Sequence, residues 1–237
     1  MPQQIFLTAE WNNLLMLNYV VDPSMLHPYL PAGIALDTFD GSTYVSLVGF
    51  EFNNTRISGF SVPFHGSFEE VNLRFYVKRG EKRGVAFIRE LVPKFAVAAI
   101  ARFAYGERYS RVPMKHRIHY RLDRDVVEAE YSWGSGTDLC SMSAETSGEV
   151  CLPTAGSLGQ FITEHYWGYA AQRGGGTIEY EVQHPRWQVR EAGPATFNGD
   201  GARYYGADLG RMLMRKPASA FLAEGSDVIV FRGTRIN

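Results

Sequence analysis

Apolar and polar residues alternate with a period of two over much of the chain, and this pattern predicts many short β-strands. The alternation is clearest over Val71–Val77, where successive side chains must point to opposite faces of a strand. Asp40-Gly41 separates the runs Ile34–Phe39 and Thr43–Phe52, which is the pattern of a tight hairpin. Further strands are expected over His116–Leu122, Val126–Trp133, Thr177–His184 and Val228–Phe231.

Three segments have helical patterns instead. Asp22-Pro23 followed by Ser24–Leu30 predicts a short capped helix. Pro93–Tyr105 is apolar nearly all round, so we expect it to form a buried helix. The third helix is expected from Ser157 to about Ala171, because Ser157 and Gln160 form a capping-box pattern; a strand over Phe161–Tyr169 is the alternative. The segment Pro194–Gly210 is predicted to form a long hairpin or a mobile loop.

The chain contains no internal repeat and no convincing linker, so we expect a single domain over residues 1–237. Many short strands with few helices predict a mainly β (α+β) architecture, either a barrel or a sandwich. In the barrel reading, the helix predicted from Pro93 packs against the sheet.

Composition narrows the classes of partner. The 24 basic and 25 acidic side chains give a net charge of −1, which argues against nucleic acid or an anionic membrane as the main partner. The two cysteines are too few for a disulfide scaffold, and residues 1–10 lack a secretion signal, so we expect a cytoplasmic protein. His116 and His119 are three residues apart on a predicted strand and fall on opposite faces, so no metal site is expected, and no cofactor either. The composition is compatible with a homo-oligomer as well as with a monomer.

The strand predicted around Val71–Val77 has one apolar face and one polar face. The polar face carries Glu70, Asn72, Arg74 and Tyr76. Such a face can simply be solvated, or it can line the inside of a barrel. In the second case Arg74 would bind a substrate carboxylate, because a guanidinium matches a carboxylate in a bidentate geometry.

Lys94 is one of few lysines and lies in an otherwise apolar run. At the start of a buried helix, both burial and the helix dipole would disfavour its charged form, and a neutral amine can form a Schiff base with a ketone. The alternative is a lysine that extends from the first helical turn to the surface.

His184 falls on the apolar face of the strand predicted from Thr177, with Trp187 shortly after it. It can be a core histidine or can line a cavity. If Arg74 faces inward, its burial requires an acceptor, for which we propose Glu70 or Glu164. We therefore expect at least three residues of one set to line a single pocket. The set is Glu70, Asn72, Arg74, Lys94, Glu164 and His184.

Several of these segments resemble the YqjF-like family. The opening stretch from Trp11 to Pro31, the stretch from Gly66 to Val77, the stretch Phe161–Tyr166 and the motif His184–Trp187 carry the resemblance, which covers most of residues 5–192. That family is similar in fold to acetoacetate decarboxylase. The resemblance implies a closed, cone-like antiparallel β-barrel with a few flanking helices, and it implies no established activity.

A weaker similarity to acetoacetate decarboxylases falls on the same residues. Arg89-Glu90 followed by Pro93-Lys94 resembles the segment that carries the Schiff-base lysine, and Phe68-Glu69-Glu70-Val71 resembles the setting of the family's barrel glutamate. The similarity implies that Lys94 and Glu70 are catalytic residues. Phe95 stands where that family has a second lysine, and its N-terminal substrate arginine has no counterpart near Asn12.

Two functional hypotheses follow from these residues. The first is a Schiff-base lyase in which a small keto acid enters the barrel, Arg74 holds its carboxylate, Lys94 attacks its ketone and Glu70 moves protons. Asn72, Tyr76, Glu164, His184 and Trp187 complete the expected substrate site. The second hypothesis is a non-catalytic module that binds a small apolar carboxylic acid, which the replacement by Phe95 favours. A structural protein with a filled barrel is a third reading.

Overall fold

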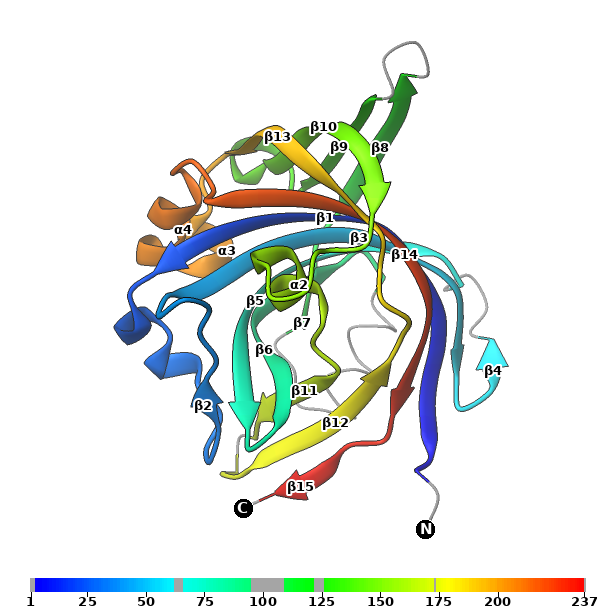
Figure 1. The fold of residues 1–237 in the computed structure, drawn as a ribbon, viewed down its shortest axis with the longest axis vertical. Coiled ribbons are helices and arrows are strands. Elements are labelled where there is room, and N and C mark those ends of the chain that lie inside the picture. The colour runs from blue at the N-terminus through cyan, green and yellow to red at the C-terminus, as the bar shows by residue number, and fades with distance from the viewer. Residues whose placement is uncertain (1–2, 62–65, 95–108, 122–125, 173, 237) are drawn as a thin grey trace.

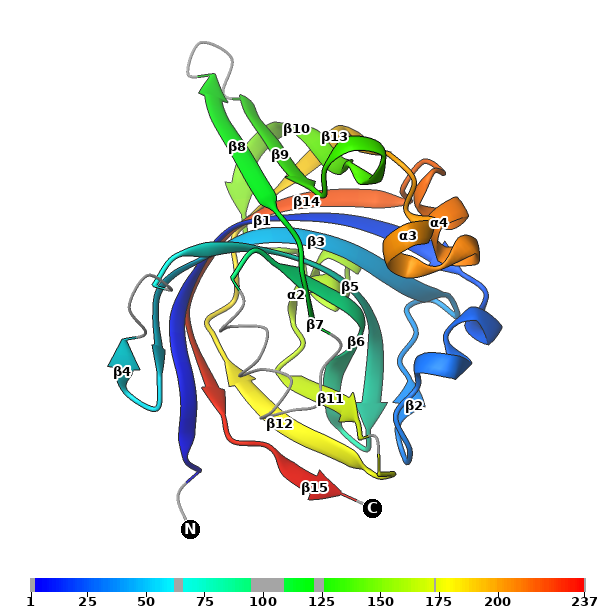
Figure 2. The ribbon, with the colours of Figure 1, turned by 180° about the vertical axis from the view of Figure 1, so that it is seen from behind.

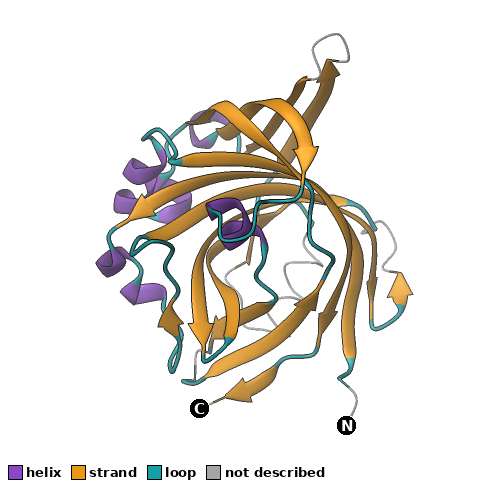
Figure 3. Ribbon diagram, in the orientation of Figure 1, coloured by secondary structure: helices purple, strands orange, loops and turns teal. Residues whose placement is uncertain are grey.

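The computed structural model describes residues 3–61, 66–94, 109–121, 126–172 and 174–236 (Figure 1). Strands dominate the described chain, and the helices are few and short (Figure 3). The strands are β1 (Ile5–Val21), β2 (Ala35–Leu36), β3 (Thr43–Ile57), β4 (Phe60–Ser61), β5 (Phe68–Arg79), β6 (Lys82–Val92), β7 (Tyr109–Arg111), β8 (Met114–Arg121), β9 (Val126–Trp133), β10 (Cys140–Cys151), β11 (Trp167–Ala171), β12 (Thr177–Gln183), β13 (Val189–Asn198), β14 (Ser219–Phe231) and β15 (Thr234–Ile236). The helices are α2 (Leu158–Thr163), α3 (Ala202–Tyr205) and α4 (Ala207–Leu213), with 3₁₀ turns at Pro23–Met25, His27–Tyr29 and Gly136–Asp138.

The strand pairings run in a ring. Hydrogen-bonded neighbours follow the order β12-β11-β6-β5-β3-β1-β14, and β14 pairs back onto β12 through Val182–Val230 and Gln183–Ile229. Figure 1 looks into this ring. The expectation of a purely antiparallel ring is wrong at one place, because β6 and β11 pair in parallel. The segment that connects β6 to β11 includes β8, β9, β10 and α2. A connection of this length allows β6 and β11 to pair in parallel.

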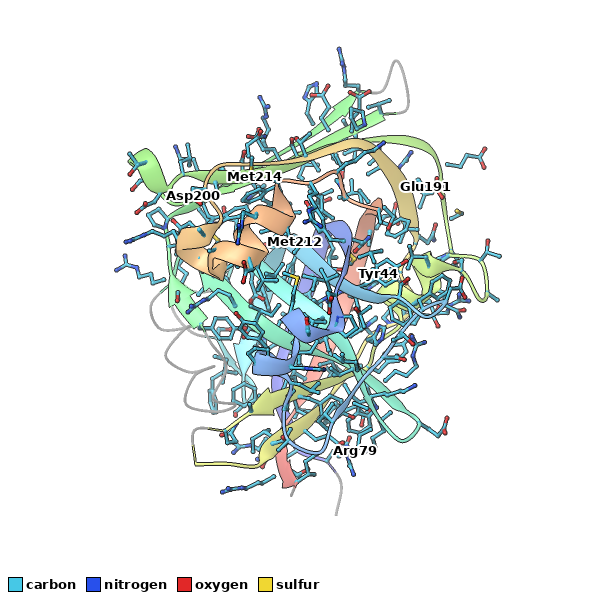
Figure 4. All side chains as sticks on the ribbon, turned by 90° about the vertical axis from the view of Figure 1, so that its left-hand side faces the viewer. Tyr44, Arg79, Glu191, Asp200, Met212 and Met214 are labelled. Carbon is cyan, nitrogen blue, oxygen red and sulfur yellow. The ribbon has the colours of Figure 1, made fainter. Side chains whose placement is uncertain are left out.

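A second layer covers one side of the ring from outside. It consists of the strands β13-β10-β9-β8, joined to the ring by the pairing of β13 with β14, and of α3 and α4 beside them (Figure 2). Figure 4 shows the side of α3 and α4, where Met212 lies in the core and Met214 is exposed. Among the described residues, no helix is long and apolar enough to cross a membrane.

Both faces of the ring sheet are buried, each against a different set of side chains. The outer face of β5 carries Leu73 and Phe75, which belong to one core cluster with Tyr131 and Trp133 of β9 in the second layer. The inner face of the ring carries a second cluster, which includes Phe161 of α2. We call the space enclosed by the ring the lumen. The alternation along β5 therefore separates an outer core from the lumen rather than a core from water.

The polar face of β5 is on the lumen side. Glu70, Asn72, Arg74 and Tyr76 are only 2%, 2%, 8% and 1% exposed, so the solvated reading of this face is wrong. Arg74 of β5 pairs with Phe87 of β6, and Asn72 of β5 pairs with Glu90 of β6. The register shifts between these two pairs. The shift leaves Ile88 as the extra residue of a β-bulge, which allows both Phe87 and Glu90 to share the face of the polar residues.

Several predicted elements are confirmed. The tight turn at Asp40-Gly41 is present, with positive φ of 48° and 76°, and an isolated bridge between Phe39 and Ser42 closes it. The hairpin predicted around it is wrong, because β2 pairs with β5 and not with β3. The strand prediction over Val126–Trp133 matches β9. At Asp22 the cap is present and accepts a hydrogen bond from the Ser24 amide, but the helix predicted after it is two 3₁₀ turns.

Other predicted elements are wrong or lie outside the described chain. The helix expected from Ser157 to Ala171 ends at Thr163, and β11 follows it. The segment Pro194–Gly210 ends β13 and continues into α3 and α4 instead of forming a loop. Val228–Phe231 is the end of the longer strand β14, and β15 follows it. The helix predicted over Pro93–Tyr105 lies outside the described residues from position 95 onward.

Candidate functional site

A small cavity with a volume of about 40 Å³ lies inside the ring. Its wall comes from β1, β5, β6, β11, β12 and the segments around α2 and after β12. The wall is mostly aromatic and aliphatic, with a few polar groups. The residues of the wall that carry polar side-chain groups suited to ligand binding are Trp11, Arg74, His165, Tyr180, His184 and Trp187. A small apolar cavity with a few convergent polar groups is typical of a small-molecule site.

Arg74 is the cation of this cavity. Its guanidinium is buried, and its Nη2 lies 3.9 Å from the sulfur of Met16. Its Nε has no hydrogen-bond partner among the described residues. The guanidinium also lies 5.9 Å from the ring centre of Tyr76. A buried guanidinium is strongly stabilised by an anion, because burial removes the water that would otherwise solvate its charge.

His165 lines the cavity two residues after the end of α2 and is 8% exposed. Its Nε2 lies 3.6 Å from Oδ2 of Asp37, which also accepts a 2.7 Å hydrogen bond from Nε of Arg83. Burial, together with the charges of Arg83 and Arg74, lowers the pKa of His165 to about 4. Burial alone would raise the pKa of Asp37, but hydrogen bonding and the Arg83 charge lower it to about 2. At neutral pH the pair is therefore a carboxylate beside a neutral imidazole.

Aromatic rings form the rest of the wall. His184 follows the last residue of β12 and stacks on Trp187, with ring centres 4.0 Å apart, and burial lowers its pKa. The ring centres of Trp187 and Trp11 lie 6.1 Å apart, and Nε1 of Trp187 donates a hydrogen bond to the hydroxyl of Ser226. Nε1 of Trp11 is buried with no hydrogen-bond partner among the described residues. These rings therefore offer flat apolar surfaces and, at Trp11, an N–H without a partner among the described residues.

A cluster of acidic groups lies further along the same face of β5. Glu70 accepts hydrogen bonds from Asn72 at 2.9 Å and from the hydroxyl of Tyr109 at 3.3 Å. Burial raises the pKa of Glu70 to about 7, against the opposing effects of Asn72, Tyr109 and the Arg74 charge. Glu90 lies opposite Asn72 on β6, and its charge acts on Tyr109, as does that of Glu70. Glu70 can therefore hold a proton near neutral pH, next to the phenol of Tyr109.

The Tyr76 hydroxyl is already engaged. It lies 2.5 Å from the hydroxyl of Ser46, which donates to Asn18 at 2.6 Å. The ring of Tyr76 contacts those of Phe161 and His165. Tyr76 therefore ties β5 to α2 through its ring and to β3 and β1 through its hydroxyl.

The structure brings only part of the predicted set together. Of the six residues expected to share one pocket, only Arg74 and His184 line the cavity described above, so the expectation of at least three is not met there. Trp187 of the wider substrate set lines it as well, whereas Glu70 and Asn72 belong to the acidic cluster. Lys94 is half-buried, follows the end of β6, and is not among the residues that line this cavity.

The proposed pairing of Arg74 with Glu164 is wrong. Glu164 forms an ion pair with Arg186 and accepts a hydrogen bond from Gln160. Glu164 caps the end of α2, which directs its side chain to the neighbouring loop rather than to β5. The other proposed partner, Glu70, acts on Arg74 through charge alone, since no hydrogen bond joins these two residues in the described structure.

Asp37, His165, Trp11 and Glu90 were not singled out by the sequence as site residues. Trp11 and His165 stand in segments that carry the YqjF-like resemblance, which is the signal that could have marked them. The sequence around Asp37 carries no such signal, because the role of Asp37 depends on His165, which is far away in the chain. In the described part of the chain, no group of three or more potential ligands is placed to hold a metal ion.

Solved structures with low sequence identity share this fold. An acetoacetate decarboxylase-like enzyme from Sphingomonas wittichii RW1 is 13% identical, with a TM-score of 0.66, over 98% of this chain and 93% of that one. The acetoacetate decarboxylase of Legionella pneumophila is 12% identical, with a TM-score of 0.68, over 97% and 87%. The enduracididine biosynthesis enzyme MppR, in complex with pyruvate, is 10% identical, with a TM-score of 0.70, over 100% and 92%. The chain therefore has the acetoacetate decarboxylase-like fold.

The chain belongs to the DUF2071 family of uncharacterized conserved proteins, whose model matches residues 8–227. It is 34% identical over 88 residues to the uncharacterized protein YqjF of Bacillus subtilis (strain 168), and this match covers 36% of each chain. The match thus spans about a third of that relative's length. The resemblance to the YqjF-like family and its relation in fold to acetoacetate decarboxylase are confirmed.

Proposed function

We propose that the lumen of this protein binds a small carboxylic acid, with Arg74 as the group that holds the carboxylate. One observation carries the proposal: Arg74 is a buried cation at a cavity, and its Nε has no hydrogen-bond partner among the described residues. A ligand carboxylate would supply the missing acceptor and the missing negative charge in one step. The aromatic wall around Trp187 suits the apolar part of such a ligand.

The fold supports the same ligand class. MppR, which shares the fold, binds pyruvate, a small acid with one carboxylate and one ketone. We also propose that the ring acts as a closed barrel within one domain over residues 1–237. The pairing of β12 with β14 supports this, because it joins the two ends of the strand order.

The binding proposal predicts that Arg74→Gln loses most of the affinity for short carboxylic acids. Isothermal titration with propionate and pyruvate should show at least about tenfold weaker binding, because a charge-assisted hydrogen bond contributes roughly 1.5–3 kcal/mol. Arg117→Gln is the matched control, since Arg117 is an exposed residue that pairs with Glu130 on β9. Equal affinity in Arg74→Gln and the unaltered protein would remove the basis of the proposal.

A second candidate function is Schiff-base chemistry at Lys94. Lys94 stands two residues after Val92, which belongs to the cluster on the lumen side, and four after Glu90 of the acidic cluster. The amine of Lys94 would attack a ligand ketone, water would leave, and the resulting iminium would accept the electron pair of a breaking C–C bond. Glu70 would move the protons, for which a pKa of about 7 is well suited.

Borohydride reduction tests this second function. Incubation with pyruvate or acetoacetate and borohydride should attach the reduced ligand to Lys94, and peptide mass mapping should locate it there and find none in Lys94→Arg. Lys115→Arg, an exposed residue on β8, is the control and should keep the adduct. If keto acids bind through Arg74 and no adduct forms on Lys94, the protein is a binding module without this chemistry.

A further inference from the structure

Three residues that line the lumen cavity carry buried side-chain nitrogens without a hydrogen-bond partner among the described residues. They are Nε1 of Trp11, Nε of Arg74, and both ring nitrogens of His165. The residues come from β1, from β5 and from the segment between α2 and β11, so three separate elements bring them to one place. Buried polar groups are nearly always paired in folded proteins, and such a convergence indicates a ligand whose polar atoms complete the pairs.

The nitrogens differ in what they require. The N–H groups of Trp11 and Arg74 can only donate, so each requires an acceptor oxygen on the ligand. A neutral histidine has one donor and one acceptor nitrogen, and its neighbours decide which is which.

Asp37 decides this for His165. Its Oδ2 lies 3.6 Å from Nε2 of His165, so the proton of the ring is best placed on Nε2, where it faces a negative charge. Arg83 holds this carboxylate in place with a 2.7 Å hydrogen bond. Burial keeps the pKa of His165 near 4, so the ring carries only this one proton at neutral pH. Nδ1 is then an acceptor and requires a donor.

We infer that the ligand is a small hydroxy acid, whose hydroxyl donates to Nδ1 of His165 while its carboxylate binds Arg74. A hydroxyl oxygen can at the same time accept from Nε1 of Trp11, whereas a ketone oxygen accepts but never donates. This inference rests on the proposed binding of a carboxylic acid at Arg74. It goes further in assigning to Asp37 and His165 the choice between a hydroxy acid and the corresponding keto acid.

The expected discrimination is large. A site built to bond a ligand hydroxyl leaves its own polar atom unpaired when an analogue without the hydroxyl binds. We expect hydroxy acids to bind at least about tenfold more tightly than the analogues that cannot donate.

The test uses two matched ligand series with the full chain. Titration calorimetry compares lactate, pyruvate and propionate, and then 3-hydroxybutyrate, acetoacetate and butyrate. The hydroxy acid should bind most tightly in each series. His165→Phe should bring the three affinities together while it leaves carboxylate binding intact, and His165→Gln should retain part of the preference because its amide oxygen can accept. His119→Gln, at an exposed position of β8, is the control and should change nothing.

The outcomes separate this inference from the proposed function. If none of the six acids binds, the proposed carboxylate site is wrong, and the inference fails with it. If the acids bind in an Arg74-dependent manner but with equal affinities, or if the keto acids bind more tightly, the site stands and the hydroxy-acid inference is overturned. The ligand series with the unaltered protein decides this even if His165→Phe does not fold.

Discussion

At the scale of single residues, burial shifts the pKa values of Glu70 and His165 in opposite directions. The pKa of Glu70 rises from 4.5 to about 7, and that of His165 falls from 6.5 to about 4. In both cases burial disfavours the charged form, and the charge of Arg74 acts on both groups. Glu70 and His165 are therefore both neutral in the folded protein over most of the interval between these values.

These shifts make opposite contributions to stability against pH. The folded state holds the proton of Glu70 more tightly than the unfolded state, so this contribution falls as the pH rises from 4.5 to about 7. Unfolded His165 takes up a proton that the folded state rejects, so its contribution falls as the pH decreases from 6.5 to about 4. Where the two intervals overlap, the contributions oppose each other.

We predict that each single variant removes the pH dependence of the group that it replaces, so that its difference from the unaltered protein reports that group. Relative to the unaltered protein, Glu70→Gln should gain more than about 1 kcal/mol of unfolding free energy as the pH rises across its interval. His165→Gln should gain a similar amount as the pH falls across its own. Urea unfolding at several pH values measures both, and Glu130→Gln, at a half-buried residue that pairs with the exposed Arg117, is the control. Difference curves that stay flat with pH would show that these groups are not buried as described.

At the scale of elements, α2 positions one side of the cavity although it has only six residues. So short a helix is not stable by itself and depends on its cap and its packing. Ser157 accepts a hydrogen bond from the Gln160 amide at the N-terminus of α2, and Phe161 packs on the rings of Tyr76 and Tyr44. Because His165 follows two residues after α2, the cap also helps to hold the histidine in place.

The cap yields a prediction with a matched control. Ser157→Ala should lower the free energy of unfolding by about 1 kcal/mol, because the amide loses its partner. Ser135 occupies the same position before the 3₁₀ turn Gly136–Asp138 but makes no side-chain cap bond, so Ser135→Ala should change the free energy of unfolding by less than about 0.5 kcal/mol. Thermal and urea unfolding compare the two. Equal losses from both substitutions would contradict the role of the cap.

At the scale of the whole molecule, the ring sheet separates the main core from the candidate site. Leu73 and Arg74 are neighbours in β5, yet Leu73 packs in the outer cluster with the second layer, whereas Arg74 lines the cavity. The second layer of β8, β9, β10 and β13 contributes to stability on the outer side of the ring. The lumen is therefore able to leave polar groups available for a ligand.

This separation predicts different effects for substitutions on the two faces. Leu73→Ala should lower the free energy of unfolding by about 2–5 kcal/mol, because Leu73 is fully buried, and should change carboxylic acid affinity by less than about twofold. Phe87→Ala, on the cavity side of β6, should weaken binding instead. Denaturant unfolding and titration calorimetry on both variants check this. A large loss of affinity in a folded Leu73→Ala protein would argue against two independent faces.

The sequence by itself determined the local features of this protein. The alternation of apolar and polar residues specified β5 and β9, the pair Asp40-Gly41 specified a tight turn, and Ser157 specified where α2 begins. Each of these features depends on residues only a few positions apart in the chain. The polar set of Glu70, Asn72, Arg74 and Tyr76 was visible in the same way.

Only the tertiary structure decided what those features face. Alternation assigns residues to two faces but does not say which face is covered, and here the second layer covers one and the lumen encloses the other. The bulge at Ile88, the turn of Glu164 toward Arg186, and the approach of Asp37 to His165 all depend on segments distant in the chain. Charge and hydrogen-bond partners are set by proximity in space, so the chemistry of the lumen emerges only when the ring of strands brings these segments together.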